Sequence, residues 1–395
     1  GKTDAMDLDL THPALADLKR TAQRRLPHFV WEYLDSATGG EAAVARAEAA
    51  LDAVTLAPRV LRGTQEADLS VTLFGRTHPL PFGIAPVGMS GLIRPGAEAT
   101  LARLAAAEDI PYGLSTVAAA APEEVGPHLG AAGWFQLYPP GDAEIRRDML
   151  RRAKAAGFTG LILTVDVPIA SRRERQRRAR LTTPMRVTPR VMLDCARRPV
   201  WSLRRLHAGI PQLATLAPYA QDAGSRDSTA HVGYLLRTAP DWDYLKALRQ
   251  DWDGPLMVKG AMVPEDGARC LDLGADALWL SNHGGRQFEG GPAPLHQLAA
   301  MRGALGPEPR LIYDGAIRSG LDILRVLATG ADFVMLGRAF HHGLAAFGPG
   351  GAAHVVHVLR AGLKADMGQL GAARLADLPD HLAPGARAAD RAATW

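Results

Sequence analysis

A histidine in a glycine-rich segment is the strongest candidate in the chain for acid–base chemistry. His283 lies in the segment SNHGGR (281–286) directly after an apolar run, and Asp166 ends another apolar run. An imidazole titrates near neutral pH, and a carboxylate partner orients the ring and stabilises the imidazolium that forms when the ring takes a proton. We therefore predict that His283 is a general base paired with Asp166. Taken singly, the two residues also fit a turn histidine and a helix-capping aspartate.

Two segments that contain glycine and arginine predict a phosphate site. The segment DGAIRSG (314–320) and the pair Gly337-Arg338 each follow an apolar run. Glycine lets backbone N–H groups approach phosphate oxygens, and arginine supplies a charged bidentate fork. In (β/α)8 barrels such a site forms from the loops after strands seven and eight. Tight turns without a ligand are the alternative, and the presence of both segments favours the phosphate site.

Other polar residues also stand where apolar runs end. Gln136 and Tyr138 end one run, Thr164 ends a second and Lys259 ends a third. A lysine in this position is able to stabilise negative charge on a bound cofactor or to form a Schiff base with a carbonyl substrate. In a parallel barrel these ends share one rim, so we expect the side chains to converge there.

The elements that position these residues are short apolar runs alternating with Ala/Leu/Arg-rich stretches, a pattern typical of βαβ units. We predict eight strands, at 82–86, 112–115, 134–138, 161–166, 256–259, 277–281, 311–314 and 333–337. Several runs are apolar at consecutive positions, as expected for parallel strands covered on both faces. The predicted fold is α/β, a (β/α)8 TIM barrel.

One domain is expected to fill residues 1–395. We predict a helical cap in 1–79 with helices at 13–24 and 41–50, a barrel over 80–345 whose first helix spans 95–107, and C-terminal helices in 346–395. A long insertion, 171–240, follows the fourth strand. Connections of this length in barrels are usually functional or mobile.

Composition excludes several other classes of protein. The chain has 395 residues, 47% of them hydrophobic, a net charge of only +4 and two cysteines, Cys195 and Cys270, outside any metal-binding spacing. This composition fits an ordinary globular protein and gives no case for nucleic-acid binding, a metal site or a disulfide framework. The polar, acidic start lacks a signal-peptide pattern, and no apolar run is long enough to span a membrane, so we expect a cytoplasmic protein.

The motifs together resemble one family, from about Pro27 to about Leu378. The segments SNHGGRQ (281–287), DGAIRSG with Gly337-Arg338, WFQLY (134–138), LTVD (163–166) and VKG (258–260) are similar, in order, to those of the FMN-dependent 2-hydroxy-acid dehydrogenases and oxidases. The segments APVGMSG (85–91), PVWSL (199–203) and GIPQLA (209–214) most resemble the mandelate-oxidising branch. The resemblance implies oxidation of an (S)-2-hydroxy acid to the 2-keto acid with FMN as acceptor.

The resemblance also implies a role for each matching residue. His283 takes the proton, Asp166 orients it, and Lys259 stabilises the reduced FMN. The substrate contacts implied are Tyr33, Gly88, Val117, Tyr138, Arg173, His283 and Arg286, with the two arginines and Tyr33 on the carboxylate. The FMN contacts implied are Ala85, Pro86, Val87, Gly88, Ser115, Gln136, Tyr138, Thr164, Lys259, Ser281, His283 and Arg286 at the ring, and Asp314, Gly315, Ala316, Arg318, Gly337 and Arg338 at the ribityl phosphate. Structural alternatives are strongest for Arg173, in an arginine run, and for Tyr33, which fits a packing role.

Two departures from the family pattern affect the expected properties. Ala316 stands where many relatives have a second glycine, and its methyl group crowds the phosphate loop unless the backbone angle there is ordinary. Val117 stands where relatives that use small substrates often have a tryptophan. Space at Gly88 and Val117 therefore favours aromatic, mandelate-like acids over glycolate or lactate.

Alternatives of other classes are a non-redox isomerase or aldolase barrel that holds the phosphate of its own substrate, and an inactive barrel kept as an interaction scaffold. The sequence leaves the electron acceptor open among oxygen, a quinone and a cytochrome, and it leaves open hydride transfer or a carbanion intermediate. The resemblance implies a homo-oligomer, a tetramer.

The insertion combines basic and apolar residues. Residues 190–219 contain Arg197, Arg198, Arg204 and Arg205 beside Trp201, Leu203, Leu206, Ile210 and Leu213. This mixture predicts peripheral contact with an anionic membrane, on the inner face of the cell membrane, because basic and apolar side chains both contribute to such binding. An active-site lid or a subunit contact is the alternative, since Pro211 and Pro218 interrupt any long amphipathic helix.

Overall fold

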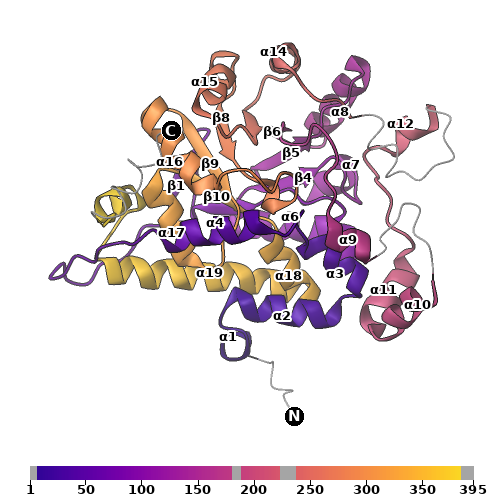
Figure 1. The fold of residues 1–395 in the computed structure, drawn as a ribbon, viewed down its shortest axis with the longest axis horizontal. Helices are drawn as coiled ribbons and strands as arrows, with labels where there is room; N and C mark the ends of the chain where they lie inside the picture. The colour runs from indigo at the N-terminus through magenta and orange to yellow at the C-terminus, as the bar shows by residue number, and fades with distance from the viewer. Residues whose placement is uncertain (1–6, 180–187, 223–236, 384–395) are drawn as a thin grey trace.

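The strands form a closed barrel, as the sequence predicts. The computed structural model describes residues 7–179, 188–222 and 237–383. Within these residues, eight parallel strands close in the order β10-β3-β4-β5-β6-β7-β8-β9 (Figure 1). The ends of the predicted strands differ from the observed ends by no more than two residues. The barrel strands are β3 (Phe82–Ile84), β4 (Tyr112–Ser115), β5 (Gly133–Leu137), β6 (Gly160–Thr164), β7 (Leu256–Lys259), β8 (Ala277–Leu280), β9 (Arg310–Asp314) and β10 (Phe333–Leu336).

The two faces of the strands bury different sets of side chains. Alternate residues such as Phe135, Leu161 and Leu278 point outward into the core shared with the helices, while Trp134 and Trp279 lie in a second apolar cluster. Because side chains alternate along a strand, Gln136 shares the inward face of β5 with Trp134. The same alternation places a polar layer at the carboxyl end of the barrel, formed by Ser115, Gln136, Thr164, Lys259, Ser281 and Asp314.

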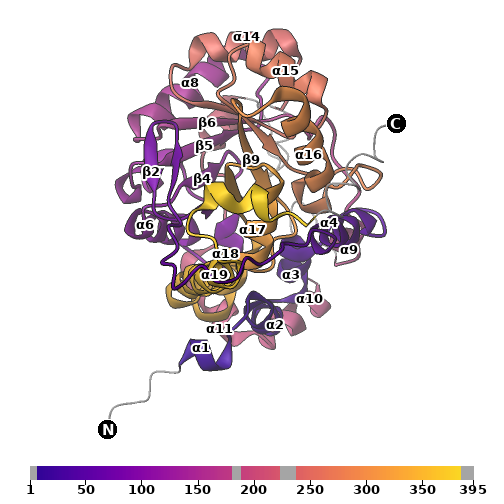
Figure 2. The same cartoon turned by 90° about the vertical axis from the view of Figure 1, so that its left-hand side faces the viewer.

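Helices surround the barrel strands (Figure 2). Side-chain caps begin several of them, with Asp142, Asp241 and Ser319 each accepting from backbone N–H groups of the first turn; such a cap stabilises a helix by roughly 1 kcal/mol. The surrounding helices are α6 (Ala97–Glu108), α8 (Ala143–Ala155), α14 (Trp242–Asp251), α15 (Pro264–Asp272), α16 (Pro294–Leu305), α17 (Gly320–Thr329) and α18 (Arg338–Phe347), with short α5 (Ser90–Ile93), α7 (Pro122–Val125), η1 (Gly126–His128) and η2 (His283–Gly285) in the loops.

The N-terminal segment reaches both ends of the barrel. It contains α1 (Leu8–Thr11), α2 (Leu15–Arg25), α3 (His28–Asp35) and α4 (Ala42–Asp52). The α3–α4 connection lies at the carboxyl-terminal mouth, where Thr38 N donates to the Gly285 carbonyl at 3.0 Å. A hairpin that the sequence did not predict, β1 (Val71–Leu73) and β2 (Arg76–His78), covers the opposite end, where Phe74 meets Trp134 edge-on. The chain ends with α19 (Pro349–Leu370) beside α18, and with η3 (Leu375–His381).

The insertion after β6 forms short helices, which are α9 (Glu174–Arg178), α10 (Pro189–Ala196), α11 (Pro199–Ala208) and α12 (Ala217–Asp222). The α10–α11 hairpin is fastened to the body of the protein, because Trp201 Nε1 donates to the Leu92 carbonyl at 3.0 Å and the ring meets Phe29 edge-on. Trp201 and Leu213 are buried. Of the apolar residues in the predicted membrane-contacting segment, these two therefore pack inward and are not available for contact with lipid. Among the described helices, none is long and apolar enough to cross a membrane.

Candidate active site

The predicted base and its partner meet at the mouth of the barrel. His283 begins η2, just after β8, and its Nδ1 lies 3.2 Å from Asp166 Oδ1, beyond β6. The backbone of His283 has a left-handed φ of +56°, and its N–H donates to Ser281 Oγ at 3.0 Å. Left-handed backbone in a non-glycine residue costs of order 1–2 kcal/mol. Strain of this kind is common where a side chain must be aimed at a reaction centre.

A glycine that the sequence analysis quoted without a role makes this pair possible. Gly260 follows Lys259 at the end of β7 with φ +104°, and a Cβ there would lie 2.6 Å from Asp166 Cβ. A side chain at this position would therefore displace the carboxylate. The sequence signal that could have indicated this role is the glycine directly after Lys259, at the end of a predicted strand.

The geometry fixes which nitrogen of His283 carries the proton. Because Nδ1 faces a carboxylate, the Nδ1–H tautomer donates to Asp166 and leaves the Nε2 lone pair available. Tyr138 Oη lies 3.4 Å from Nε2. Burial lowers the pKa of His283, with the charge of Asp166 opposing that shift. Burial alone would raise the pKa of Asp166. The nearby His283 and Lys259 outweigh that effect, so the pKa of the carboxyl is lowered. The pair is therefore a neutral imidazole beside an ionised carboxylate at neutral pH.

The polar layer inside the mouth is held by its own hydrogen bonds. Ser115 Oγ donates to Gln136 Oε1 at 3.0 Å, and Gln136 Nε2 donates to Thr164 Oγ1 at 2.8 Å. Asp314 accepts from Trp279 Nε1 at 2.8 Å and from Ser281 Oγ at 2.6 Å. These bonds fix the rotamers of the layer before any ligand binds.

Lys259 supplies a fixed positive charge in the same layer. Its Nζ lies 3.7 Å from Asp314 Oδ2, and the side chain is buried. Burial disfavours the ammonium, but Asp314 and Asp166 outweigh that effect and raise the pKa of Lys259. A lysine that is charged in this way is a poor Schiff-base nucleophile and a good electrostatic partner.

Three arginines concentrate positive charge beside His283. Arg286 donates to the Ser36 carbonyl at 2.8 Å, Arg338 donates to the Gly284 carbonyl at 3.0 Å, and Arg173 donates to Gln287 Oε1 at 2.9 Å. Burial, together with the charges of Arg173 and Arg338, lowers the pKa of Arg286 to about 9. A bound anion would relieve this repulsion, so the cluster favours carboxylate or phosphate groups.

The predicted phosphate loop has one open and one strained position. Gly315 has φ +120°, and an added Cβ would meet Asn282 Oδ1 at 3.5 Å, an ordinary contact distance. Ala316 has φ +57°, so its backbone angle is not ordinary. The guanidinium of Arg318 is engaged by Asp52 at 2.6 Å and by Asp322 at 2.9 Å. Its predicted phosphate contact would have to compete with these carboxylates.

The wall predicted to be spacious is packed. A Cβ at Gly88 would lie 2.7 Å from Val117 Cγ2, and Tyr33 Oη donates to the Gly88 carbonyl at 2.9 Å. The absence of a side chain at Gly88 lets Val117 and Tyr33 approach, so the predicted space on this side remains a prediction. Room for a substrate on this side depends on the size of residue 117.

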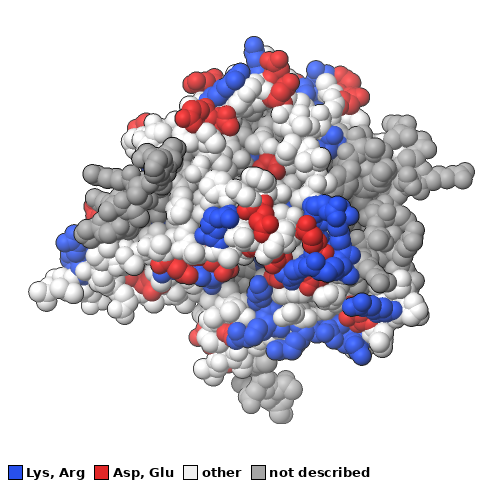
Figure 3. All heavy atoms as spheres, in the orientation of Figure 1, with Lys and Arg blue, Asp and Glu red and all other residues white. Residues whose placement is uncertain are grey.

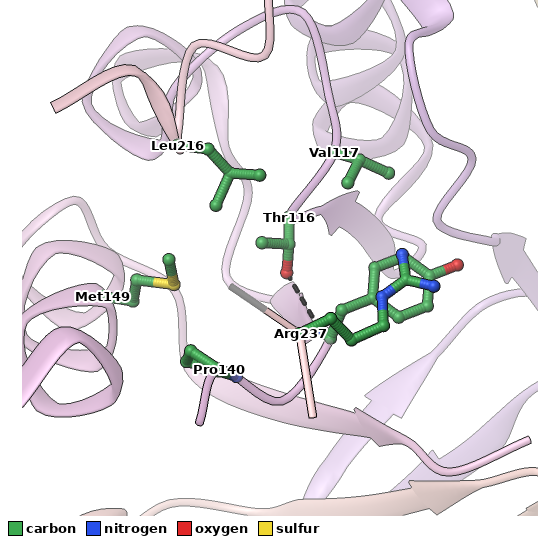
Figure 4. A pocket seen from close by; sticks show the side chains of 7 residues that line it. Thr116, Val117, Pro140, Met149, Leu216 and Arg237 are labelled. Carbon is green, nitrogen blue, oxygen red and sulfur yellow. Dashed lines mark hydrogen bonds between the residues drawn. The ribbon is translucent and has the colours of Figure 1, made fainter. Parts of the chain in front are cut away.

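Sequence reasoning missed Arg237, which lies against Tyr138. The guanidinium carbon stands 4.0 Å from the centre of the Tyr138 ring, and Figure 4 shows the Arg237 side chain among the residues that line the adjoining cavity. Arg237 is placed there by an antiparallel bridge to Pro140. Burial raises the pKa of Tyr138, and the Arg237 charge opposes the shift. A small cavity beside this stack is lined by Thr116, Val117, Tyr138, Pro140, Met149, Leu216 and Arg237.

Comparison with known proteins decides the family. Residues 22–384 match the sequence profile of the family described as FMN-dependent dehydrogenase. The chain belongs to this family. The dehydrogenase is 36% identical to an L-lactate dehydrogenase of Pseudomonas aeruginosa (strain LESB58), over 92% of this chain and 96% of that protein. It is 37% identical to an L-lactate dehydrogenase of Xanthomonas axonopodis pv. citri (strain 306), over 92% and 94%.

Two solved structures are similar to the dehydrogenase over nearly its whole length. One is the monotopic membrane protein (S)-mandelate dehydrogenase, with a TM-score of 0.89 and 34% identity, over 94% of this chain and 98% of that chain. Another is a mandelate oxidase, with a TM-score of 0.79 and 30% identity, over 93% and 97%. Members of this family use FMN, and the dehydrogenase is an FMN-dependent 2-hydroxy-acid-oxidising flavoprotein.

The residues at the mouth fit this cofactor. The inward polar layer presents amide, hydroxyl and ammonium groups, which are the partners that flavin ring oxygens and nitrogens need. The open position at Gly315 and the arginine cluster suit a phosphate group.

Proposed function

We propose that this FMN-dependent dehydrogenase oxidises an (S)-2-hydroxy acid with an aromatic side chain to the 2-keto acid. The observation that carries the proposal is the Tyr138–His283–Asp166 series, with distances of 3.4 and 3.2 Å, beside the arginine cluster. Such a site combines a base for the substrate with cations for its carboxylate. When bound, FMN supplies the acceptor for the two electrons that leave the substrate.

The base and its neighbours divide the proton chemistry. His283 Nε2 takes a proton from the substrate, and Asp166 stabilises the imidazolium that results. The Tyr138 hydroxyl donates a hydrogen bond to the substrate oxygen. The guanidinium of Arg237 stacks on the Tyr138 ring and fixes its position. Lys259 stabilises negative charge on the reduced ring system.

The arginine cluster binds the two anionic groups. Arg286 and Arg173 bind the substrate carboxylate as planar donors. Tyr33 of α3 joins that site when its hydroxyl turns from the Gly88 carbonyl to the carboxylate. The 314–316 loop, Gly337 and Arg338 would hold the phosphate of FMN. Arg318 would have to release Asp52 and Asp322 to join them, because its backbone N–H and its guanidinium both donate to these carboxylates. The backbone of Ala85, Pro86 and Val87 would bound the ring of FMN on one face, and Ser115, Gln136, Thr164 and Ser281 would supply its polar contacts.

Valine at position 117 supports an aromatic substrate, because a larger side chain there would fill the region above the bound acid. The mandelate-oxidising structures support the same class. The L-lactate dehydrogenase relatives favour a second candidate, a lactate-type substrate.

The deciding experiment compares kcat/KM for (S)-mandelate, L-lactate and glycolate with purified yellow enzyme. We expect mandelate to be preferred. A preference for lactate would leave the dehydrogenase chemistry intact and replace the aromatic assignment, whereas no reduction of bound FMN by any of the three acids would contradict the function.

The α10–α11 hairpin supports a peripheral membrane location. Its outer surface exposes apolar side chains beside Arg190, Arg197 and Arg204, and Figure 3 shows Lys and Arg gathering over α2, α9 and this hairpin. We infer that the hairpin contacts an anionic lipid surface and that a quinone in the lipid reoxidises the enzyme. Anaerobic reduction followed by mixing with a quinone or with oxygen tests the acceptor. The exposed apolar residues are Met192, Leu193, Val200, Leu203, Leu206 and Ile210.

A further inference from the structure

A buried hydrogen bond joins two helices that follow different barrel strands and are not adjacent in sequence. Ser90 Oγ and His341 Nε2 lie 2.6 Å apart, and both residues are almost fully buried. Ser90 begins α5 in the loop after β3, and His341 lies in the first turn of α18, after β10. Neither residue has a role in the function proposed above.

The direction of this bond follows from the second ring nitrogen. His341 Nδ1 lies 2.8 Å from the Gly337 carbonyl, which only accepts, so Nδ1 carries the hydrogen. Burial lowers the pKa of His341 to about 4, and the ring is neutral at neutral pH. Nε2 is then an acceptor, and the Ser90 hydroxyl donates to it.

The bond lies between two segments assigned to FMN. On one side, Ser90 Oγ is 3.1 Å from the carbonyl of Val87, in the backbone segment assigned to the ring. The single hydroxyl hydrogen is directed mainly to His341, so this is a close contact and not a second full hydrogen bond. On the other side, His341 bonds Gly337, directly before Arg338. The segments also touch directly, because a Cβ at Gly337 would lie 3.0 Å from Val87 Cγ2. The separation between the ring-binding and phosphate-binding segments is therefore set at this junction.

We propose that Ser90 and His341 are positioning residues for FMN. Their hydrogen bond holds the two segments at the spacing that the cofactor needs, so losing it weakens FMN binding more than it weakens the fold. The proposal rests on the FMN contacts of these segments and is independent of which hydroxy acid is oxidised.

The test measures FMN binding rather than turnover. Holoenzyme is diluted, and released FMN is followed by its fluorescence to obtain the dissociation constant. An unsatisfied buried polar group costs about 1–3 kcal/mol, so Ser90→Ala and His341→Gln should bind FMN ~5–150-fold more weakly. Ser90→Thr keeps the hydroxyl and should restore most of the affinity.

A matched control separates positioning from general stability. His354 is a buried histidine of α19 whose Nε2 donates at 2.8 Å to the carbonyl of His12, in the N-terminal segment and not in either FMN-binding segment. His354→Gln should lower the thermal stability of the protein without changing the FMN dissociation constant. The proposal is overturned if Ser90→Ala and His341→Gln bind FMN as tightly as the wild type, or if all three variants lose affinity alike. Should Ser90→Ala fail to fold, His341→Gln and Ser90→Thr carry the same comparison.

Discussion

His283 and Ala316 are two of the non-glycine residues at the mouth that adopt left-handed backbone, and their side chains differ in what they do. His283 at φ +56° places an imidazole against Asp166, so the strain there orients a group that reacts. Ala316 at φ +57° carries only a methyl group, so the strain there orients no reactive group. A cost of about 1–2 kcal/mol per residue is tolerable at the first position and is avoidable at the second.

Replacement of the base should separate binding from chemistry. In His283→Gln, bound FMN and its visible spectrum should persist, because the polar layer and phosphate loop are untouched. Turnover should fall by ~10²–10⁴-fold, the usual contribution of a general base. Stopped-flow reduction of the bound FMN by substrate measures the step directly. Reduction at near wild-type speed would show that another group takes the proton.

The pH dependence follows from the His283–Asp166 pair. In the wild type, kcat/KM should rise with pH through the pKa of His283, which burial holds below its ordinary value of 6.5. Asp166 raises that pKa, so Asp166→Asn should move the acid limb to lower pH. The same variant should lower kcat by roughly 10²-fold or more, because the imidazolium loses its counter-charge. Profiles of kcat/KM against pH for both proteins check the sign, and a shift to higher pH would refute the assignment.

The strained loop residue, Ala316, should tolerate glycine but not valine. Ala316→Gly removes the left-handed strain but adds freedom to the unfolded chain, and these effects of about 1 kcal/mol each nearly cancel in stability. Ala316→Val adds a β-branched side chain and should cost ~1–3 kcal/mol, with weaker FMN binding. Thermal unfolding and FMN titration distinguish the two. Equal behaviour of the glycine and valine variants would mean that the loop relaxes around residue 316.

At the scale of secondary-structure elements, the regular part of the chain was predictable. The eight apolar runs gave the strands because both of their faces are buried and their ends carry turn-forming and polar residues. The pairing of His283 with Asp166 followed, since the carboxyl ends of parallel strands share one rim. The strand positions predicted from the apolar runs are confirmed, and the family motifs fall at the ends of the same strands. Both follow from local sequence, because each strand pairs with its immediate neighbours in the barrel.

Features that depend on distant contacts were not predictable. The β1–β2 hairpin has strands of three residues each, too short for an alternating pattern to stand out. The inward orientation of Trp201 depends on a carbonyl of Leu92, more than a hundred positions away in sequence. The Ser90–His341 bond likewise joins the first and last barrel loops, and no local pattern marks either residue.

Arg237, near the end of the 171–240 insertion, should affect catalysis through its contact with Tyr138. Arg237→Leu should reduce kcat, because it removes the cation that stacks on Tyr138 at 4.0 Å. If Arg237 acts through the Tyr138 hydroxyl, its replacement should have little further effect in a Tyr138→Phe background, a coupling that a double-mutant cycle measures. Additive losses in the double variant would show that Arg237 acts by a separate route.

At the scale of the whole molecule, the exposed apolar and basic hairpin predicts binding to lipid. The protein should sediment with anionic liposomes at low salt and be partly released at high salt, because each basic residue near the surface contributes about 1 kcal/mol that salt screens. Replacement of residues 190–219 by a short polar linker should abolish sedimentation.

A finer variant keeps the hairpin and changes Leu203, Leu206 and Ile210 to Gln. Its control changes Val60 and Leu61 to Gln, which are also exposed apolar residues but lie outside the hairpin. Intact protein that stays in the supernatant at low salt would assign the hairpin to a lid or a subunit contact. Light scattering tests the predicted tetramer, whose mass would be four times that of the 42.1 kDa chain.

The β1–β2 hairpin, at the end of the barrel opposite the mouth, also limits where the chain can be cut without exposing its core. Leu73 and Phe74 rest on the aromatic cluster that contains Trp134 and Phe333, so they form a floor for a barrel whose first strand begins only at Phe82. A fragment cut before that strand would hold all eight barrel strands and still expose this cluster to water. The indoles of Trp134 and Trp279 would then become accessible to a quencher such as acrylamide. A design that transfers this barrel to another protein must therefore include residues 71–78.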